Sequence, residues 1–434
     1  MATTEGSEPP DGDAPERSLA PRAWMLGAAT SVIVTVLMLY AGEFVLRVLR
    51  TDPAFAAIEA AQRGGRHWDG RSRVEVVRDL RTQGVDAVSR TVPAKLIEEM
   101  PDGSYHTRIM IDGREVLPLA GISRKTVVLC NETGEYAVYQ SDEHGFRNPL
   151  GIWNRAPVDL VLIGDSFTVG ECVPSEETLG GWLRRHYPTT VNLGVGGHAP
   201  LFELAILEEY ASALKPRRVI WFYFENDLWW FDLGINKRTP LLMRYLEPDF
   251  RQGLLHMQPE IDASLTELWA TESRNPVATA LEVMEKVRGS GVGRLLRFVT
   301  LQKLRATIVQ LRRLPQSPAE RELADFALFE AILKQARDRT ASWGGELVFV
   351  YLPGSWNFDQ GLGWRPRDDR VRARVLDLAA ALGLPVIDVR EAMEEHESPL
   401  SLYSYPGTSV LGPPHFNGNG YEFVASLVLD RIGR

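Results

Sequence analysis

The feature that most constrains this 434-residue chain is a series of five short apolar runs beyond Pro157. Stretches with helical periodicity separate the runs, and near-continuous apolarity is typical of parallel strands that are covered on both faces. This alternation is the pattern of βαβ units, so we predict an α/β domain with one parallel sheet. The predicted strands are 158–163, 190–195, 218–224, 347–352 and 385–389.

The connections between these runs differ greatly in length. After the first run we predict a helix that Ser175 caps, with Glu176 and Glu177 near its positive end and a buried stripe of Leu179, Trp182 and Leu183. Between the third and fourth runs lies an insertion, about 231–345, which is far longer than an ordinary crossover and therefore has structure of its own.

Part of this insertion is strongly basic. Residues 286–313 carry eight Lys and Arg side chains and no acidic one, interleaved with leucines at helical spacing. A basic amphipathic helix of this kind can lie against anionic lipid or a polyanionic glycan. The alternative is a helix that packs its leucines on the domain and leaves its arginines in water.

Near the N-terminus, residues 23–42 contain no charged side chain. A helix of that length spans about 30 Å, the thickness of the bilayer hydrocarbon, so we predict one transmembrane helix. A cleaved signal peptide is the alternative, although Tyr40-Ala41-Gly42-Glu43 is a poor cleavage site. Two arginines flank the run on each side, so charge does not decide the orientation. We expect the short N-terminal tail to stay in the cytoplasm and the C-terminal bulk to lie outside it.

These patterns divide the chain into successive parts. Short β-like runs with Asp-Gly and Glu-Thr-Gly turns precede the α/β domain and predict a small β unit. The predicted parts are a disordered tail 1–22, the transmembrane helix 23–42, a largely helical connector 43–104, the β unit 105–156 and the α/β domain 157–434.

Composition excludes several classes of function. The net charge of −9 and the pI near 5.6 argue against general binding of nucleic acid. The eight histidines show no helical metal-ligand spacing, so we predict no metal site. Cys130 and Cys172 allow at most one disulfide, which would place the β unit beside the α/β domain; two free buried thiols are the alternative.

Polar groups follow three successive predicted strands. Gly164-Asp165-Ser166 ends the first, Gly194-Val195-Gly196-Gly197 follows the second, and Asn226 follows the third. The carboxyl ends of parallel strands are where open α/β sheets place their reacting groups. Ser166 can then be a nucleophile, while its own N–H, the N–H of Gly197 and the Asn226 amide can donate to an oxyanion. Taken singly, these residues are equally compatible with caps and tight turns.

A general base can come from the C-terminal part of the chain. His415 follows the fifth predicted strand and precedes a helical pattern, so it too can stand at this edge of the sheet and accept the proton of Ser166. An isolated histidine would more often be structural.

Together the four blocks resemble the SGNH/GDSL hydrolase family, with Ser166, Gly197, Asn226 and His415 at the matching positions and Asp165 in support. The resemblance covers about 157–434, and residues 141–148 resemble the lead-in found in membrane-anchored bacterial members. It implies a flavodoxin-like three-layer α/β/α sandwich with a five-stranded sheet, and ester hydrolysis or acyl transfer through a serine acyl-enzyme without cofactor.

One position departs from the family. An aspartate usually stands two or three residues before the histidine, where this chain has Gly412 and Pro413. Three alternatives remain: a Ser166–His415 dyad with a backbone carbonyl, a distant acid such as Asp359 or Asp388, or a catalytically degenerate protein. Loss of the acid costs about four orders of magnitude in rate in the serine-protease case.

The resulting prediction is a membrane-anchored serine esterase that hydrolyses or transfers acyl groups, O-acetyl above all. Its expected partners are an acylated envelope or exopolysaccharide glycan or a small ester, the membrane through one helix, and other proteins of polysaccharide assembly. The alternatives are a lipid or thioester hydrolase, if the insertion forms an acyl channel, and a non-catalytic glycan-binding or scaffold protein.

Overall fold

The computed structural model describes residues 20–49, 67–228, 233–273, 298, 299, 301, 304, 318–358, 369–404 and 414–433. The chain forms two compact units, one of residues 1–51 and 291–314, the other of residues 52–290 and 315–434. Most of the predicted tail 1–22 and most of the basic segment 286–313 lie outside the described residues, as do Asp359, Gly412 and Pro413.

A five-stranded parallel sheet forms the centre of the larger unit, as predicted. Its spatial order is β9-β8-β10-β11-β12, which is the flavodoxin-like order 2-1-3-4-5 when the strands are counted along the chain. Each predicted apolar run overlaps one of these strands. The bounds are β8 (Leu160–Gly164), β9 (Val191–Asn192), β10 (Arg218–Phe224), β11 (Glu346–Leu352) and β12 (Val386–Asp388).

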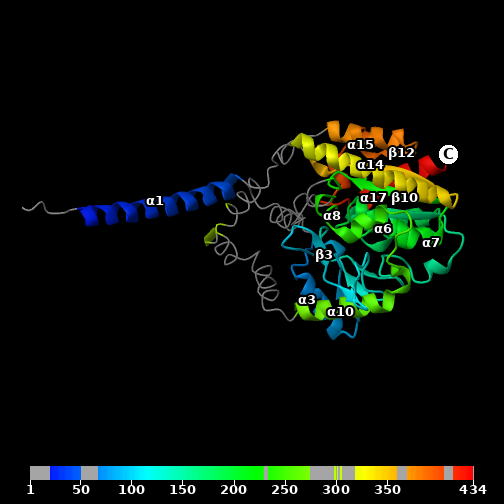
Figure 1. The fold of residues 1–434 in the computed structure, drawn as a ribbon, viewed down its shortest axis with the longest axis horizontal. Helices are drawn as coiled ribbons and strands as arrows, with labels where there is room; N and C mark the ends of the chain where they lie inside the picture. The colour runs from blue at the N-terminus through cyan, green and yellow to red at the C-terminus, as the bar shows by residue number, and fades with distance from the viewer. Residues whose placement is uncertain are drawn as a thin grey trace, which may run out of the picture. The chain divides into compact units, whose positions relative to one another are not determined.

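Helices cover both faces of this sheet and make the three layers (Figure 1). Alternate strand side chains point to opposite faces, so Leu162 and Phe222 pack in one core while Ile163 and Tyr223 pack in the other. On the first face lie α5 (Leu179–Arg184), α16 (Val389–Glu394) and α17 (Gly418–Ile432). On the second lie α6 (Pro200–Ile206), α14 (Pro318–Ser342) and α15 (Asp369–Ala381).

The helix after β8 begins later than predicted. Ser175 starts only a 3-10 turn, η3 (Ser175–Glu177), and α5 begins after Thr178. The Thr178 hydroxyl accepts the N–H of Gly181 at 3.0 Å from an extended backbone, which is the geometry of an N-cap. Two capping residues stand three positions apart, and the second one caps the α-helix.

A small β unit precedes the sheet. The parallel pair β1 (Ala87–Ser89) and β6 (Thr126–Val128) continues into antiparallel β7 (Val138–Gln140). The predicted helical connector is therefore only partly helical, because α3 (Arg73–Thr82) is followed by β1, which joins this sheet. Two hairpins complete the unit: β2 (Ile97–Glu99) with β3 (Tyr105–Thr107), and β4 (Met110–Ile111) with β5 (Arg114–Glu115).

The first long helix of the insertion, α10 (Gln258–Ser273), packs on the β unit, and Figure 1 shows it beside α3. The Asp262 carboxylate accepts both the N–H and the hydroxyl of Ser123, at 2.9 and 2.6 Å. Arg81 of α3 lies 4.1 Å from the ring centre of Trp269 in α10. This helix of the insertion thus covers the unit that precedes the sheet.

The smaller unit contains α1 (Ala20–Leu49), whose stretch 27–45 is long and apolar enough to cross a membrane, with a mean hydropathy of 1.8. Part of the insertion returns to this helix. The Glu43 carboxylate accepts the N–H of Leu304 at 2.7 Å, and the Tyr40 hydroxyl donates to the Val299 carbonyl at 3.0 Å.

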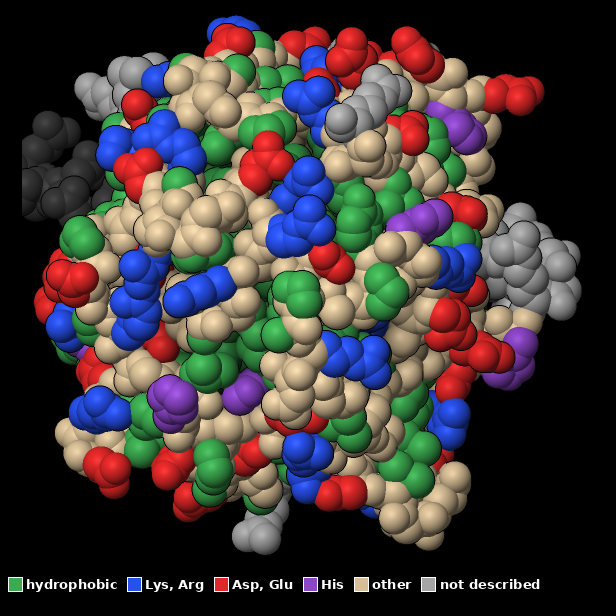
Figure 2. Space-filling model, turned by 90° about the vertical axis from the view of Figure 1, so that its right-hand side faces the viewer, with side chains coloured by type: hydrophobic (Ala, Val, Ile, Leu, Met, Phe, Trp, Pro, Cys, Tyr) green, Lys and Arg blue, Asp and Glu red, His purple; other side chains and the backbone are tan. Residues whose placement is uncertain are grey.

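Short helices connect the larger elements. They are η1 (Pro93–Lys95), η2 (Ile152–Asn154), α4 (Ser166–Val169), the π-helical η4 (Leu207–Ala211), α7 (Ser212–Leu214), α8 (Leu233–Asn236), α9 (Pro240–Met243), η5 (Arg244–Leu246), η6 (Leu254–His256), η7 (Ser355–Asn357) and η8 (Pro399–Leu402). On the face drawn in Figure 2, the described acidic and basic side chains are interspersed rather than gathered by sign.

Candidate active site

Ser166 is presented by a sharp turn at the carboxyl end of β8. Gly164 has φ +153°, and a Cβ there would collide with the Thr168 side chain and lie 2.7 Å from the Phe222 carbonyl oxygen, so only glycine fits. The Asp165 carboxylate caps α4 by accepting the N–H of Phe167 at 2.9 Å. Ser166 is therefore the first residue of a short helix and is half-buried at the sheet edge.

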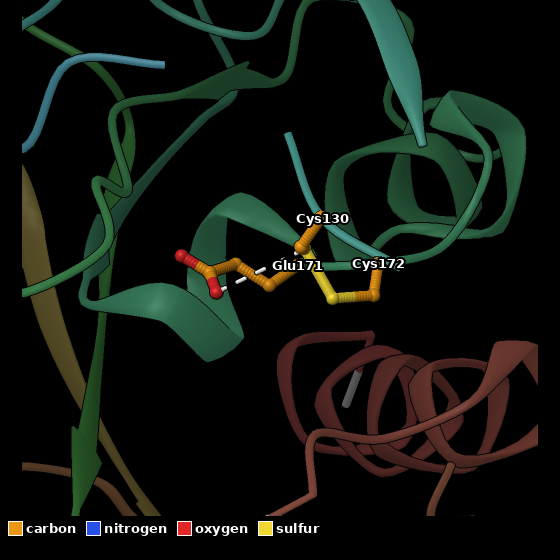
Figure 3. Close-up of side chains that lie close together, drawn as sticks. All are labelled: Cys130, Glu171 and Cys172. Carbon is orange, nitrogen blue, oxygen red and sulfur yellow. Dashed lines mark hydrogen bonds between the residues drawn. A yellow bond between two sulfur atoms is a disulfide. The ribbon is translucent and has the colours of Figure 1, made fainter. Parts of the chain in front are cut away.

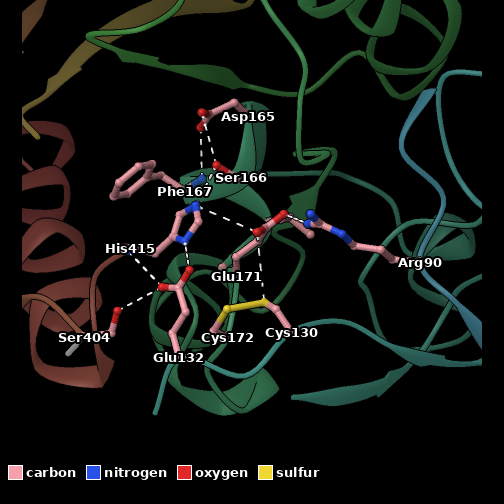
Figure 4. A network of polar contacts seen from close by, with 12 residues as sticks. Arg90, Cys130, Glu132, Asp165, Ser166, Phe167, Glu171, Cys172, Ser404 and His415 are labelled. Atoms are coloured by element: carbon pink, nitrogen blue, oxygen red, sulfur yellow. Dashed lines mark hydrogen bonds and ion pairs between the residues drawn. A yellow bond between two sulfur atoms is a disulfide. The ribbon is translucent and has the colours of Figure 1, made fainter. Parts of the chain in front are cut away.

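His415 lies against this serine, although 249 positions separate them. Its Nε2 is 2.9 Å from Ser166 Oγ. The His415 backbone is held by a bond from the Ser404 N–H to its carbonyl, at 2.8 Å, and by Asn417, which caps α17. The structure thus brings together the two residues on which the sequence prediction depends (Figure 4).

The other ring nitrogen of His415 contacts a residue that sequence reasoning missed. Nδ1 lies 2.9 Å from Oε1 of Glu132, whose Oε2 accepts the His415 N–H at 3.0 Å and the Ser404 hydroxyl at 2.9 Å. Glu132 is buried, with 5% of its surface exposed. Burial alone raises a carboxyl pKa, but the adjacent His415 and these hydrogen bonds hold the pKa of Glu132 below its ordinary value.

Glu132 corrects the expectations about which group orients the His415 ring. The hypothesis of Asp388 is wrong, because that carboxylate accepts the N–H of Arg390 at 3.1 Å and pairs with Arg372. A backbone carbonyl is not the partner of Nδ1 either, because Glu132 occupies that side of the ring. Glu132 comes from the β unit, 283 positions before His415. Its only signal in the sequence is its place two residues after Cys130.

Cys130 and Cys172 form a disulfide, the first of the two alternatives (Figure 3). The bridge joins the segment that carries Glu132 to the loop that follows Ser166. The segment that carries Glu132 is thereby tied covalently to the unit that supplies Ser166 and His415.

The proposed oxyanion donors lie at the same edge. The chain beyond β9 continues beside β8, since the N–H of Val195 donates to the Gly164 carbonyl at 3.2 Å. Gly197, with φ +84°, follows in the same loop. Asn226 is half-buried in the turn that follows β10. β8 and β10 are adjacent, and this point, where the strand order reverses, is where such sheets bind ligands.

The lead-in motif 141–148 forms hydrogen bonds to the backbone near this edge of the sheet. The buried Arg147 guanidinium donates to the carbonyls of Gly170 and Val173 at 2.6 and 2.7 Å, which orders the loop after α4. The Asn148 amide bridges the Asp142 carboxylate and the Asn192 carbonyl, at 2.8 and 2.9 Å. The motif therefore positions the loops of the site.

Among the residues that the structure describes, two groups of side chains are close enough together to hold a metal, Cys130 with Glu171 and Cys172, and Glu132 with Cys172 and His415. Both groups depend on sulfur atoms that are joined in the disulfide, and a bridged sulfur is not a thiolate ligand. Neither group therefore offers a three-donor metal site. Burial raises the pKa of Asp165, beside Ser166, to about 6.

A 2-1-3-4-5 parallel sheet with a serine and a histidine in hydrogen-bond contact at its carboxyl edge has the architecture of the SGNH class of hydrolases. The model of the GDSL-like lipase/acylhydrolase family matches residues 162–423, which is more than half of the chain. This protein belongs to that family.

The solved structures to which this chain is similar are distant in sequence. A lipase/acylhydrolase from Enterococcus faecalis is 17% identical, with 63% of this chain and 94% of that chain covered and a TM-score of 0.32. A catalytic mutant of an acetylxylan esterase from Geobacillus stearothermophilus is 15% identical, with 63% and 94% covered and a TM-score of 0.32. The acetyl xylan esterase AlAXEase is 12% identical, with 63% and 98% covered and a TM-score of 0.33. No curated protein matches this chain significantly.

Proposed function

We propose that this protein is a serine esterase that works through Ser166, His415 and Glu132. Oγ of Ser166 attacks the ester carbonyl carbon while Nε2 of His415 takes the hydroxyl proton. His415 then returns that proton to the departing alcohol oxygen, and an acyl-enzyme remains. Water, or a hydroxyl group of an acceptor, attacks the acyl-enzyme with His415 again as base.

The other residues act on charge and orientation. Glu132 holds the ring through Nδ1 and stabilises the imidazolium that forms during proton transfer. The N–H groups of Ser166 and Gly197 and the amide of Asn226 donate to the oxyanion of the tetrahedral intermediate.

One observation carries this proposal: both nitrogens of a single buried imidazole lie 2.9 Å from their partners, Ser166 Oγ on one side and Glu132 Oε1 on the other. The missing aspartate was the reason to consider a non-catalytic glycan-binding protein. Glu132 supplies an acid at the position that the aspartate would serve, so the catalytic function is favoured over a scaffold.

As substrate we propose an envelope or exopolysaccharide glycan, either as an O-acetyl ester that is hydrolysed or as an acceptor whose hydroxyl group takes the acetyl group from the acyl-enzyme. A lipid or thioester hydrolase is the competing function if the insertion lines an acyl channel. We further propose that α1 anchors the chain with its C-terminal bulk outside the cytoplasm. The Cys130–Cys172 bridge supports this placement, since disulfides persist in oxidising compartments.

A fluorophosphonate probe tests the catalytic function on the full-length protein in detergent. We expect covalent labelling of the wild type, and its loss in S166A and H415A with unchanged thermal unfolding. Failure to label the wild type under conditions that label an active esterase would refute the proposal. Release of acetate from an acetyl donor, with and without a sugar acceptor, then separates hydrolysis from transfer.

A further inference from the structure

A second buried carboxylate lies beside the catalytic pair, and the proposed mechanism does not use it. Oε2 of Glu171 is 3.8 Å from Nε2 of His415, the nitrogen that faces Ser166, and its side chain is only 6% exposed. Its other oxygen, Oε1, forms an ion pair with Arg90. Figure 4 shows Glu171 between the imidazole on one side and the Arg90 guanidinium on the other.

This pair also lies against the turn proposed to bind the oxyanion. A Cβ added at Gly196 would collide with Oε1 of Glu171 and lie 3.0 Å from the Arg90 guanidinium, so both charges pack on that backbone. Arg90 directly follows β1, and its N–H donates to the Val128 carbonyl at 3.2 Å. The β unit therefore supplies Arg90 as well as Glu132.

An uncompensated carboxylate at this place would oppose the reaction. It attracts the proton to Nε2 of His415, which keeps the base charged before the reaction starts. It also repels the negative charge that develops on the substrate oxygen beside Gly196 and Gly197. A guanidinium, which stays protonated at any working pH, cancels this charge and holds the carboxylate away from the imidazole.

We propose that Arg90 is a positioning residue of the active site, which neutralises Glu171 and so keeps His415 free to accept the proton of Ser166. This inference rests on the proposed serine mechanism. It assigns the β unit a second contribution besides the acid, the charge balance on the Nε2 side of the ring.

Other groups face the same imidazole and bear on its titration. Glu132 lies at Nδ1, the Asp165 carboxyl lies near the ring on the nucleophile turn, and Tyr421 of α17 is buried close to both carboxyls. Burial raises the pKa of Tyr421 well above its usual value, so the phenol stays neutral. These groups are the same in all variants of Arg90 and Glu171. Differences in the titration of His415 between such variants therefore come from the Arg90–Glu171 pair.

The test is an NMR titration of the His415 ring in full-length protein with labelled histidine. The H415Q variant assigns the signal of this ring. We expect R90M to move the midpoint up by about one pH unit, and E171Q to move it down by about as much. The double variant R90M/E171Q should lie between the two single variants, close to the wild type.

Hydrolysis of p-nitrophenyl acetate gives an independent readout. For R90M we expect kcat at pH 6 to fall about tenfold for each pH unit by which the midpoint rises. This part of the loss should disappear at pH 9, where His415 is neutral, and any loss that remains there reports the repulsion of the oxyanion by Glu171. The double variant should regain most of the loss at pH 6. The matched control is R251M, which removes an arginine from another buried glutamate, Glu208. It should lower thermal stability without changing the titration midpoint of His415 or the pH dependence of kcat.

Equal midpoints in the wild type, R90M and E171Q would overturn the inference, even if the wild type is a fully active esterase. A shift in the same direction in both variants would overturn it too, since that pattern indicates structural damage. Because the ring titration does not depend on turnover, it separates this inference from failure of the esterase proposal, which shows as absent probe labelling.

Discussion

Replacing Glu132 with glutamine tests the acid of the proposed triad, because the two side chains have nearly the same shape and glutamine carries no charge. Two donors, the His415 N–H and the Ser404 hydroxyl, point at Oε2 of this carboxylate. A glutamine must turn its carbonyl oxygen towards them, which aims its NH2 group at Nδ1 of His415. The ring then carries its proton on Nε2 and cannot accept the proton of Ser166. The corresponding change in the serine-protease case costs about 10⁴-fold in kcat, or about 5 kcal/mol of transition-state stabilisation.

We therefore expect E132Q to lose about 10³- to 10⁴-fold in kcat for p-nitrophenyl acetate, with an unchanged far-UV spectrum and an intact disulfide. E132Q/H415A should be no slower than H415A alone, because the two residues act as a unit. D388N is the matched control, since that carboxylate binds Arg372 and Arg390 and should affect stability alone. An E132Q protein that keeps more than a tenth of the wild-type kcat would refute the reasoning.

Three further predictions concern the same surroundings. S404A removes one hydrogen bond to the Glu132 carboxylate and should lower kcat about tenfold; an unchanged kcat would contradict this role. Reduction of the Cys130–Cys172 bridge by a dithiol, followed by alkylation, opens a 42-residue loop and should cost about 4 kcal/mol in denaturant unfolding. It should also slow the wild type but hardly slow E132Q further, whereas equal slowing of both would show that the bridge does not act through the acid. Burial raises the pKa of Asp165 to about 6. The protonated carboxyl therefore adds to the free energy of unfolding below pH 4, and this contribution is lost as the pH rises through 6. The Tm of D165N minus that of the wild type should therefore increase from pH 4 to pH 7, and a constant difference would argue against a raised pKa.

The sheet and its active edge were predictable because their signals are local. A strand that is covered on both faces must be apolar along its length, and each of the five predicted runs overlaps a strand of the sheet. Ser166 and Asn226 stand just beyond the ends of β8 and β10, and Gly197 lies in the loop that follows β9, so parallel pairing directs all three to one edge. Helix starts were less certain, since Ser175 and Thr178 are both good caps and only the observed backbone distinguishes them.

The sequence by itself thus determined the parallel α/β domain and the nucleophile turn at its carboxyl edge, because short-range periodicity and strand-end position encode both. Only the tertiary structure decided which acid faces His415 and which charges surround it. Glu132, Glu171 and Arg90 come from segments without a repeated pattern, and their contacts arise where the β unit packs on the sheet edge and the disulfide joins the two. Contacts across hundreds of residues depend on how surfaces fit together, and that information is not present in any single stretch of the chain.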